Sequence, residues 1–274
     1  MEPTIIILIL AVAIVMELID AGLGMGYGTV LSPLLIGVGY SPIVVVPAVL
    51  FSQAIGGFTA AMFHHKQKNV DFKPKTTNIQ KIIKSIKTNG LVYSFNKGFS
   101  KDTKIVFAIT ILGVLATIFG AVVAINIPKW LLTTYIGILV IVIGLIMIFR
   151  KKFVFSWKKM VGVGILASFN KGLSGGGFGP VTTGGQIIAG HKHKNAIGCT
   201  TLSEAPICIA SFLTYAIVKG IATYDLLIIL SVGALIGAPF GAMLTKKLNT
   251  KRLKLILGII IVLLGLWTII NMLI

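Results

Sequence analysis

Four ionisable side chains lie inside otherwise apolar stretches of this sequence: Glu17, Asp20, Lys171 and Glu204. Ionisable groups at membrane depth are costly, so each is expected to face a cavity or an ionic partner. Lys171, the cation among the four, either attracts an anionic substrate directly or pairs with one of the carboxylates, and both interpretations stay open. Glu204 falls on Gln53 when the chain is shifted by 151 residues, and a carboxylate opposite an amide favours a proton-coupling site. We therefore predict that Glu204, with Asp20 as the other candidate, carries the coupling proton.

Two glycine-rich stretches stand near these residues, GLGMGYG at 22–28 and GLSGGGFG at 172–179. Glycine inside a helix costs about 1 kcal/mol relative to alanine, so this density predicts unwound backbone followed by a half-helix. The N–H groups at the start of a helix are free and the dipole there is positive, so two such starts facing each other would bind an anion. Close packing of regular helices through small residues is the alternative.

Backbone and side-chain donors near the glycine stretches form the predicted substrate site, because hydroxyl and amide groups can bind an oxyanion. Its members are Gly24, Gly26, Gly28, Ser32, Gln53, Lys171, Ser174, Gly176, Gly177, Thr182, Thr183 and Ser203. The sequence shows no nucleophile elbow, zinc-protease motif or nucleotide-binding loop, so we expect no enzyme activity and no cofactor. His191 and His193 could form a metal pair, but no third ligand stands at ordinary spacing, and no metal site is predicted.

The sequence also contains an internal repeat. The shift of 151 residues places Tyr27-Gly28 on Phe178-Gly179, and a later shift of 121 places Phe119-Gly120-Ala121 on Phe240-Gly241-Ala242. The difference of 30 residues is a lysine-rich insert at about 73–103. We predict two transmembrane repeats, 1–149 and 150–274, each with a glycine-broken segment near its start, a pattern typical of transporters.

Composition predicts an all-α integral membrane protein. The 274 residues are 56% hydrophobic and 12% charged, whereas a soluble domain carries about 25% charged residues. Apolar runs long enough to cross a hydrocarbon core of about 30 Å recur along the whole chain. We expect about ten segments in two inverted sets of five: 3–20, 22–39, 42–63, 104–125 and 129–149, then 157–171, 173–190, 195–218, 224–245 and 251–273.

The basic residues set the predicted orientation. Of the 25 Lys and Arg residues, 22 lie in four loops, at 64–104, 150–159, 191–194 and 246–254. Such clusters mark the cytoplasmic side of a multi-pass protein of the cytoplasmic membrane, which places both termini outside. Equivalent loops of the two halves carry opposite charge bias, as an odd number of spans per half would produce. No nucleic-acid motif accompanies the net charge of +18, so we expect no nucleic-acid partner.

The insert contains a predicted basic amphipathic helix at 78–89, with isoleucines at helical spacing and lysines on the other side. Such a helix is suited to lying on the inner leaflet, where basic loops also hold anionic lipid headgroups. A regulatory or gating element is the alternative.

Several of these stretches resemble the sulfite exporter TauE/SafE family of membrane permeases. The resemblance rests on the first glycine run with the following 29–35 (TVLSPLL), on the Ser-Gln and Ser-Glu pairs at 52–53 and 203–204, on 69–72 (NVDF) and on the GLSGGGFGP run of the second half. It covers almost the whole chain except the 73–103 insert. The departures are that insert and the polar Thr182-Thr183 after the second glycine run, where the family keeps an apolar stretch. The resemblance implies transport of sulfite or organosulfonates.

The sequence therefore predicts a secondary transporter for small sulfur-containing anions that works by alternating access and is coupled to protons. Two alternatives remain. The first is an anion channel of the same fold, which would pass current faster than a carrier and would not need Glu204 to titrate. The second is a membrane metal handler or enzyme that uses His191 and His193.

Overall fold

All regular secondary structure is α-helical in the residues that the computed structural model describes, 2–74, 76, 78–149, 157–188, 191–221, 223–245, 247 and 250–273. The helices are α1 (Pro3–Leu23), α2 (Tyr27–Gly37), α3 (Pro42–Lys66), α4 (Ile79–Asn89), α5 (Leu91–Gly98), α6 (Lys101–Asn126), α7 (Lys129–Phe149), α8 (Trp157–Ser174), α9 (Phe178–Ile188), α10 (His193–Lys219), α11 (Tyr224–Leu244) and α12 (Thr250–Leu273). A helix stands at each of the ten predicted apolar segments. Most of the predicted basic loop at 150–158 lies outside the described residues.

The surface of the bundle is apolar. Seven helices in the described part of the chain are long and apolar enough to cross a membrane: α1, α3, α6, α7, α10, α11 and α12. Leu115 on α6 and Ile217 on α10 are 67% and 81% exposed, whereas the ionisable side chains at depth are buried. Apolar groups outside and polar groups inside is the arrangement that lipid requires, so this is an integral membrane protein.

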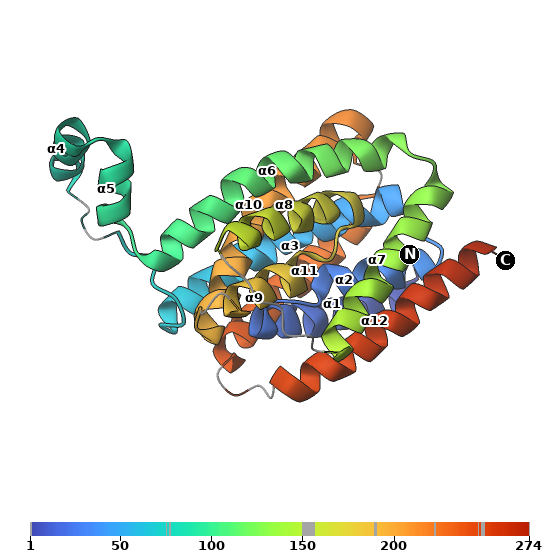
Figure 1. Ribbon diagram of the computed structural model, residues 1–274. Helices are drawn as coiled ribbons and strands as arrows, with labels where there is room; N and C mark the ends of the chain where they lie inside the picture. The colour runs from blue at the N-terminus through green and yellow to red at the C-terminus, as the bar shows by residue number, and fades with distance from the viewer. Residues whose placement is uncertain are drawn as a thin grey trace.

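The bundle has two distinct ends (Figure 1). At one end, which we call the insert end, α3 ends and α6 and α10 begin. The helix pair α4–α5 projects from the bundle at this end. Both chain termini lie at the opposite end, the termini end. The predicted helix at 78–89 is present as α4, and a 2.8 Å hydrogen bond between Ser85 Oγ and Ser94 Oγ ties it to α5. The insert therefore extends away from the transmembrane helices.

The glycine stretches end long helices and start short ones. Gly24 has a φ of 73°, a left-handed conformation that glycine adopts without strain, and its N–H donates to Asp20 O as a C-cap. The next helix, α2, has 11 residues and is about 17 Å long, roughly half of a hydrocarbon core. The same arrangement of left-handed glycines followed by a short helix occurs at Gly175 (φ 72°) and Gly177 (φ 83°), between α8 and the 11-residue α9. The breaks that the sequence predicts are therefore present.

Each short helix returns toward the end from which its preceding helix came. A four-residue link connects α2 to the start of α3 at the termini end, and α9 is followed by α10 at the insert end. The α1–α2 hairpin thus enters the bundle from the termini end, and the α8–α9 hairpin enters from the insert end. Their tips meet inside the protein.

The main helix–helix contacts follow a pattern that recurs when the two halves of the chain are exchanged. α1 packs on α11 as α8 packs on α6, while α3 packs on α10 and α7 packs on α12. The last pair approaches closely through glycines: a Cβ on Gly265 would lie 2.8 Å from Gly137 O, and a Cβ on Gly144 would lie 2.7 Å from Gly258 O. α3 ends at the end where α10 begins, so these two helices, which the shift of 151 residues places on each other, run antiparallel.

Candidate functional site

The two glycine breaks cross each other at backbone distance. A Cβ on Gly28 would lie 1.8 Å from Gly175 O, and a Cβ on Gly179 would lie 2.4 Å from Gly24 O. A side chain of any size is therefore excluded at Gly28 and Gly179, because backbone atoms of the other half occupy the space. These two contacts are related by the 151-residue shift, since Gly28 is equivalent to Gly179 and Gly24 to Gly175.

The hydroxyl groups of Ser32 and Thr183, which the shift of 151 residues places on each other, lie against the same crossing. A Cβ on Gly24 would lie 2.5 Å from Thr183 Oγ1, and a Cβ on Gly175 would lie 2.7 Å from Ser32 Oγ. Thr183 Oγ1 donates to Gly24 O at 2.9 Å. Ser32 is 1% exposed, and its Oγ has no hydrogen-bond partner among the described residues. A buried hydroxyl without a partner costs free energy, so Ser32 is a donor that a ligand could satisfy.

A buried ion pair lies beside the crossing. Lys171 Nζ on α8 is 2.8 Å from Glu204 Oε1 on α10, and the two side chains are 1% and 4% exposed. Lys171 also donates to Gln53 Oε1 on α3, which fixes the orientation of that amide because the ammonium can only donate. Gln53 Nε2 then donates to Glu204 Oε1 at 3.0 Å and, at 3.5 Å, approaches Asp20 Oδ2. Four side chains from α1, α3, α8 and α10 thus form one network.

Asp20 connects this network to the start of α2. The N–H of Tyr27, the first residue of α2, donates to Asp20 Oδ1 at 3.1 Å. The carboxylate therefore occupies the positive end of the α2 dipole, where the sequence predicts an anion. The start of α9 differs, because Gly177 N donates to the neutral Thr29 Oγ1 at 3.1 Å. Asn170 stands at the position equivalent to Asp20, and its Oδ1 accepts from Tyr135 OH.

The network holds more potential negative charge than positive. Glu17 lies one turn before Asp20 on α1, is 1% exposed, and its Oε2 has no partner among the described residues. With Glu204 this makes three buried carboxylates around the single ammonium of Lys171. Of the two interpretations left open for Lys171, the structure shows pairing with a carboxylate.

Three of the predicted site hydroxyls donate to their own helices. Ser174 Oγ donates to Asn170 O at 2.8 Å, Thr182 Oγ1 donates to Phe178 O at 2.7 Å, and Ser203 Oγ donates to Cys199 O. Gly176 N donates to Ser174 Oγ at 3.2 Å within the second break. Tyr27 was not among the predicted site residues, yet its hydroxyl donates to Ser52 Oγ at 2.9 Å and so links α2 to α3.

A chain of polar groups runs from the crossing toward the insert end. Thr183 Oγ1 is 3.0 Å from Thr200 Oγ1, and Gln186 Nε2 donates to Thr200 Oγ1 at 2.8 Å. His191 Nδ1 is 3.2 Å from Gln186 Oε1, and His191 Nε2 is 3.0 Å from Asp102 Oδ1. Asp102 lies in the first turn of α6, 89 residues away from His191 in the sequence. No spacing pattern in the sequence indicates that pair.

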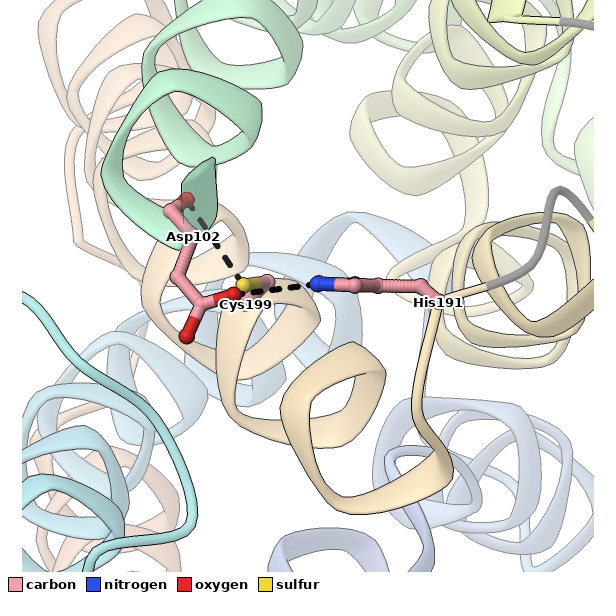
Figure 2. Close-up of side chains that lie close together, drawn as sticks. All are labelled: Asp102, His191 and Cys199. Carbon is pink, nitrogen blue, oxygen red and sulfur yellow. Dashed lines mark hydrogen bonds and ion pairs between the residues drawn. The ribbon is translucent and has the colours of Figure 1, made fainter. Parts of the chain in front are cut away.

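Cys199 joins Asp102 and His191 in a buried group (Figure 2). One potential ligand atom from each of the three residues lies within 4.8 Å of the others. His193, the partner that the sequence suggests for His191, is not a member of this group. The spacing of residues in the sequence does not indicate this group, because Asp102 comes from α6 and Cys199 from α10, outside the histidine-containing stretch at 191–194.

A cavity of about 860 Å³ opens above this group at the insert end. Its lining includes Asp102, His191 and six lysines: Lys66, Lys68, Lys73, Lys101, Lys192 and Lys194. Asp71 is the other carboxylate in the lining. The excess of ammonium groups makes the cavity attractive to anions from the solution on that side.

Comparison with known proteins gives a family. The model of the sulfite exporter TauE/SafE family matches residues 74–268, which is more than half of the chain. The "Probable membrane transporter protein YtnM" of Bacillus subtilis (strain 168) is 24% identical over 278 residues, which cover 95% of this chain and 81% of that protein. No solved structure matches the chain significantly.

Proposed function

The chain belongs to the sulfite exporter TauE/SafE family and is a multi-pass membrane transporter, not an enzyme, and on that premise we propose that it carries small sulfur-containing anions together with protons. The observation that carries the proposal is the buried pair of Lys171 and Glu204, 2.8 Å apart, beside the crossing of the two glycine breaks. Lys171 is the cation that an anion would meet there, but Glu204 already neutralises it. An anion must therefore displace this carboxylate.

Charge balance in the buried site links the anion to a proton. If Glu204 takes up a proton while an anion binds Lys171, the net charge of the site stays the same before and after. If the anion bound alone, the site would gain a negative charge away from water, next to carboxylates that are already buried. One proton with each monovalent anion is the stoichiometry that avoids this cost. Asp20 is the alternative acceptor, since Gln53 bridges both carboxylates.

The binding position that we propose lies between Lys171, Ser32 and the start of α9. Ser32 offers a buried hydroxyl without a partner among the described residues, and the α9 start has a positive dipole end without a carboxylate on it. The glycines of 175–177 allow an oxyanion to approach the backbone closely. A tetrahedral or pyramidal sulfur oxyanion fits donors that come from several directions.

We further propose that residues 1–149 and 150–274 are inverted repeats and that the halves rock against each other. The antiparallel α3 and α10, and the close contacts that recur when the halves are exchanged, support this arrangement. The lysine-rich insert end would face the cytoplasm, in the cytoplasmic membrane, with both termini outside. Anionic lipid headgroups would then surround the basic loops.

Flux into proteoliposomes tests the proposal. Labelled sulfite, sulfate and an organosulfonate are offered with and without an imposed pH gradient, and empty liposomes serve as the control. We expect saturable uptake of a sulfur anion that is driven toward the alkaline side and, for a monovalent anion, is insensitive to an imposed membrane potential. Uptake that ignores the pH gradient and follows the potential would contradict proton coupling. Currents far above carrier rates would instead indicate a channel.

A further inference from the structure

Asp102, His191 and Cys199 bring three different metal-ligand atoms together at the insert end. The carboxylate comes from the first turn of α6, the imidazole from the segment before α10, and the thiol from α10 itself (Figure 2). All three residues are buried, and their ligand atoms lie within 4.8 Å of one another. His191 and Asp102 also line the 860 Å³ cavity, so an ion could reach them from solution.

The hydrogen atoms of the polar chain decide which nitrogen of His191 is protonated. Thr200 Oγ1 accepts from Gln186 Nε2 at 2.8 Å, so the amide NH₂ of Gln186 faces Thr200. Gln186 consequently turns its carbonyl oxygen toward His191, and Nδ1 of His191 must carry a hydrogen to donate to it.

This orientation places two hydrogen-bond acceptors, His191 Nε2 and Asp102 Oδ1, against each other. A neutral imidazole with its hydrogen on Nδ1 has a lone pair on Nε2, and that lone pair faces Asp102 Oδ1 at 3.0 Å. Two acceptors at this distance repel each other unless a proton or a metal ion lies between them. Cys199 places a third potential ligand atom beside this contact, and its thiol donates to the main-chain oxygen of Asp102 at 3.7 Å.

The hydrogen-bond partners of His191 and Asp102 resemble those that orient the ligands in known metal sites. His ligands of metals usually donate their other ring N–H to an oxygen, as His191 Nδ1 does to Gln186. Asp102 Oδ2, the oxygen turned away from His191, accepts from Asn195 Nδ2 at 2.8 Å and from Asp71 N at 2.9 Å. Those contacts hold the carboxylate in place while leaving Oδ1 available to an ion.

We propose that Asp102, His191 and Cys199 bind Zn²⁺ or a similar divalent transition-metal ion. A nitrogen, an oxygen and a sulfur ligand suit Zn²⁺, which is commonly held by three protein ligands with a fourth position left open. With Cys199 as thiolate, the ligands carry two negative charges, so the loaded site is neutral and adds no buried charge. The proton of the thiol leaves to solvent as the metal binds, because the bound ion stabilises the thiolate. The bound ion would connect the start of α6 to α10.

Metal binding to the purified full-length protein tests the proposal without any transport measurement, so its outcome is independent of the proposed function. The protein is stripped with a chelator, dialysed against Zn²⁺ and analysed for bound metal, and a second sample is loaded with Co²⁺ for absorption spectroscopy. We expect about one Zn²⁺ per chain and a thiolate-to-cobalt charge-transfer band. Cys199→Ser should abolish the band and weaken Zn²⁺ binding at least about tenfold.

Matched variants supply the controls. Cys208→Ser changes the other buried cysteine, and His193→Gln changes the neighbouring histidine, and both should leave metal binding and the cobalt band unchanged. His191→Gln should weaken binding as Cys199→Ser does. A wild-type protein that binds no Zn²⁺ at micromolar concentration, or that binds Co²⁺ without a thiolate band, overturns the proposal even if a variant fails to fold. The Asp102–His191 contact would then hold a proton instead.

Discussion

Glu204→Gln is the substitution that should abolish the coupling between proton uptake and anion binding. It keeps the shape of the side chain and an oxygen that can accept from Lys171, but it removes the negative charge that the anion must displace. At 2.8 Å and an effective dielectric constant of about 20, the attraction between Lys171 and Glu204 is about 6 kcal/mol before desolvation is counted. Close charge pairs give measured coupling energies from about 1.5 kcal/mol upward. We therefore expect anion binding at neutral pH to tighten by about 10- to 100-fold.

The pH dependence of binding is the sharper measurement. In the wild type, each anion bound needs one proton on Glu204, so affinity should rise about tenfold for each unit that the pH falls while Glu204 is ionised. In Glu204→Gln this slope should vanish. The ligand should be an organosulfonate, which stays a monoanion throughout, and binding can be followed by calorimetry in detergent. Asp225→Asn, which removes an exposed carboxylate on α11, is the matched control and should keep the wild-type slope.

The stability of the variant gives an internal check. Removing one partner of a buried ion pair typically costs about 3–5 kcal/mol, so Glu204→Gln should melt at a lower temperature than the wild type. Saturating anion should restore much of that loss, because the anion supplies the missing negative charge. A slope of one proton per anion that survives in Glu204→Gln would refute the role of Glu204. If the same slope then disappeared in Asp20→Asn, the coupling proton would belong to Asp20.

Three further outcomes follow from the geometry. Gly28→Ala should prevent stable folding, since its Cβ would lie 1.8 Å from a backbone oxygen. Gly184→Ala should be neutral or stabilising, because no atom lies within 4 Å of the added Cβ. Thermal melting in detergent compares the two variants. Lys192→Gln combined with Lys194→Gln should weaken uptake from the insert end at low ionic strength, and the difference should shrink as salt screens the cavity charge; flux at several salt concentrations measures this. Replacing residues 79–98 by a short linker should leave the melting temperature unchanged but reduce binding of the nanodisc-embedded protein to anionic vesicles, as sedimentation would show.

Local patterns in the sequence predict much of this fold. Apolar run length predicts the helices at their observed positions, because the thickness of a bilayer sets how long a spanning helix must be. The glycine runs predict the two breaks, because helical backbone rich in glycine is unstable and left-handed conformations favour that residue. The shift of 151 residues places Gln53 on Glu204, and these two side chains are hydrogen-bonded at 3.0 Å. Each of these signals depends on neighbours in the sequence or on a repeat.

Contacts between distant segments could not be predicted in the same way. Asp102 appears in the sequence as one acid in a lysine-rich insert, and nothing there indicates that it meets His191 and Cys199. Asp20 appears as a membrane carboxylate, but its role as a cap on α2 depends on how the chain turns back at Gly24. Helical periodicity indicates which face of a helix is apolar, not which helix packs against it. The metal-ligand group was missed for that reason.

The proposed two-fold relation between the halves also explains why the repeat is imperfect at its centre. A residue close to a two-fold axis meets its own equivalent, and Gln53 and Glu204, separated by the repeat shift of 151, are hydrogen-bonded at 3.0 Å. Two glutamates in these positions would place like charges about 3 Å apart, where both cannot ionise. Two glutamines would remove the carboxylate that lies 2.8 Å from Lys171 Nζ. One amide and one carboxylate around a single ammonium satisfy both constraints, so the glycines that form the crossing can stay equivalent while the charged residue beside it must differ between the halves.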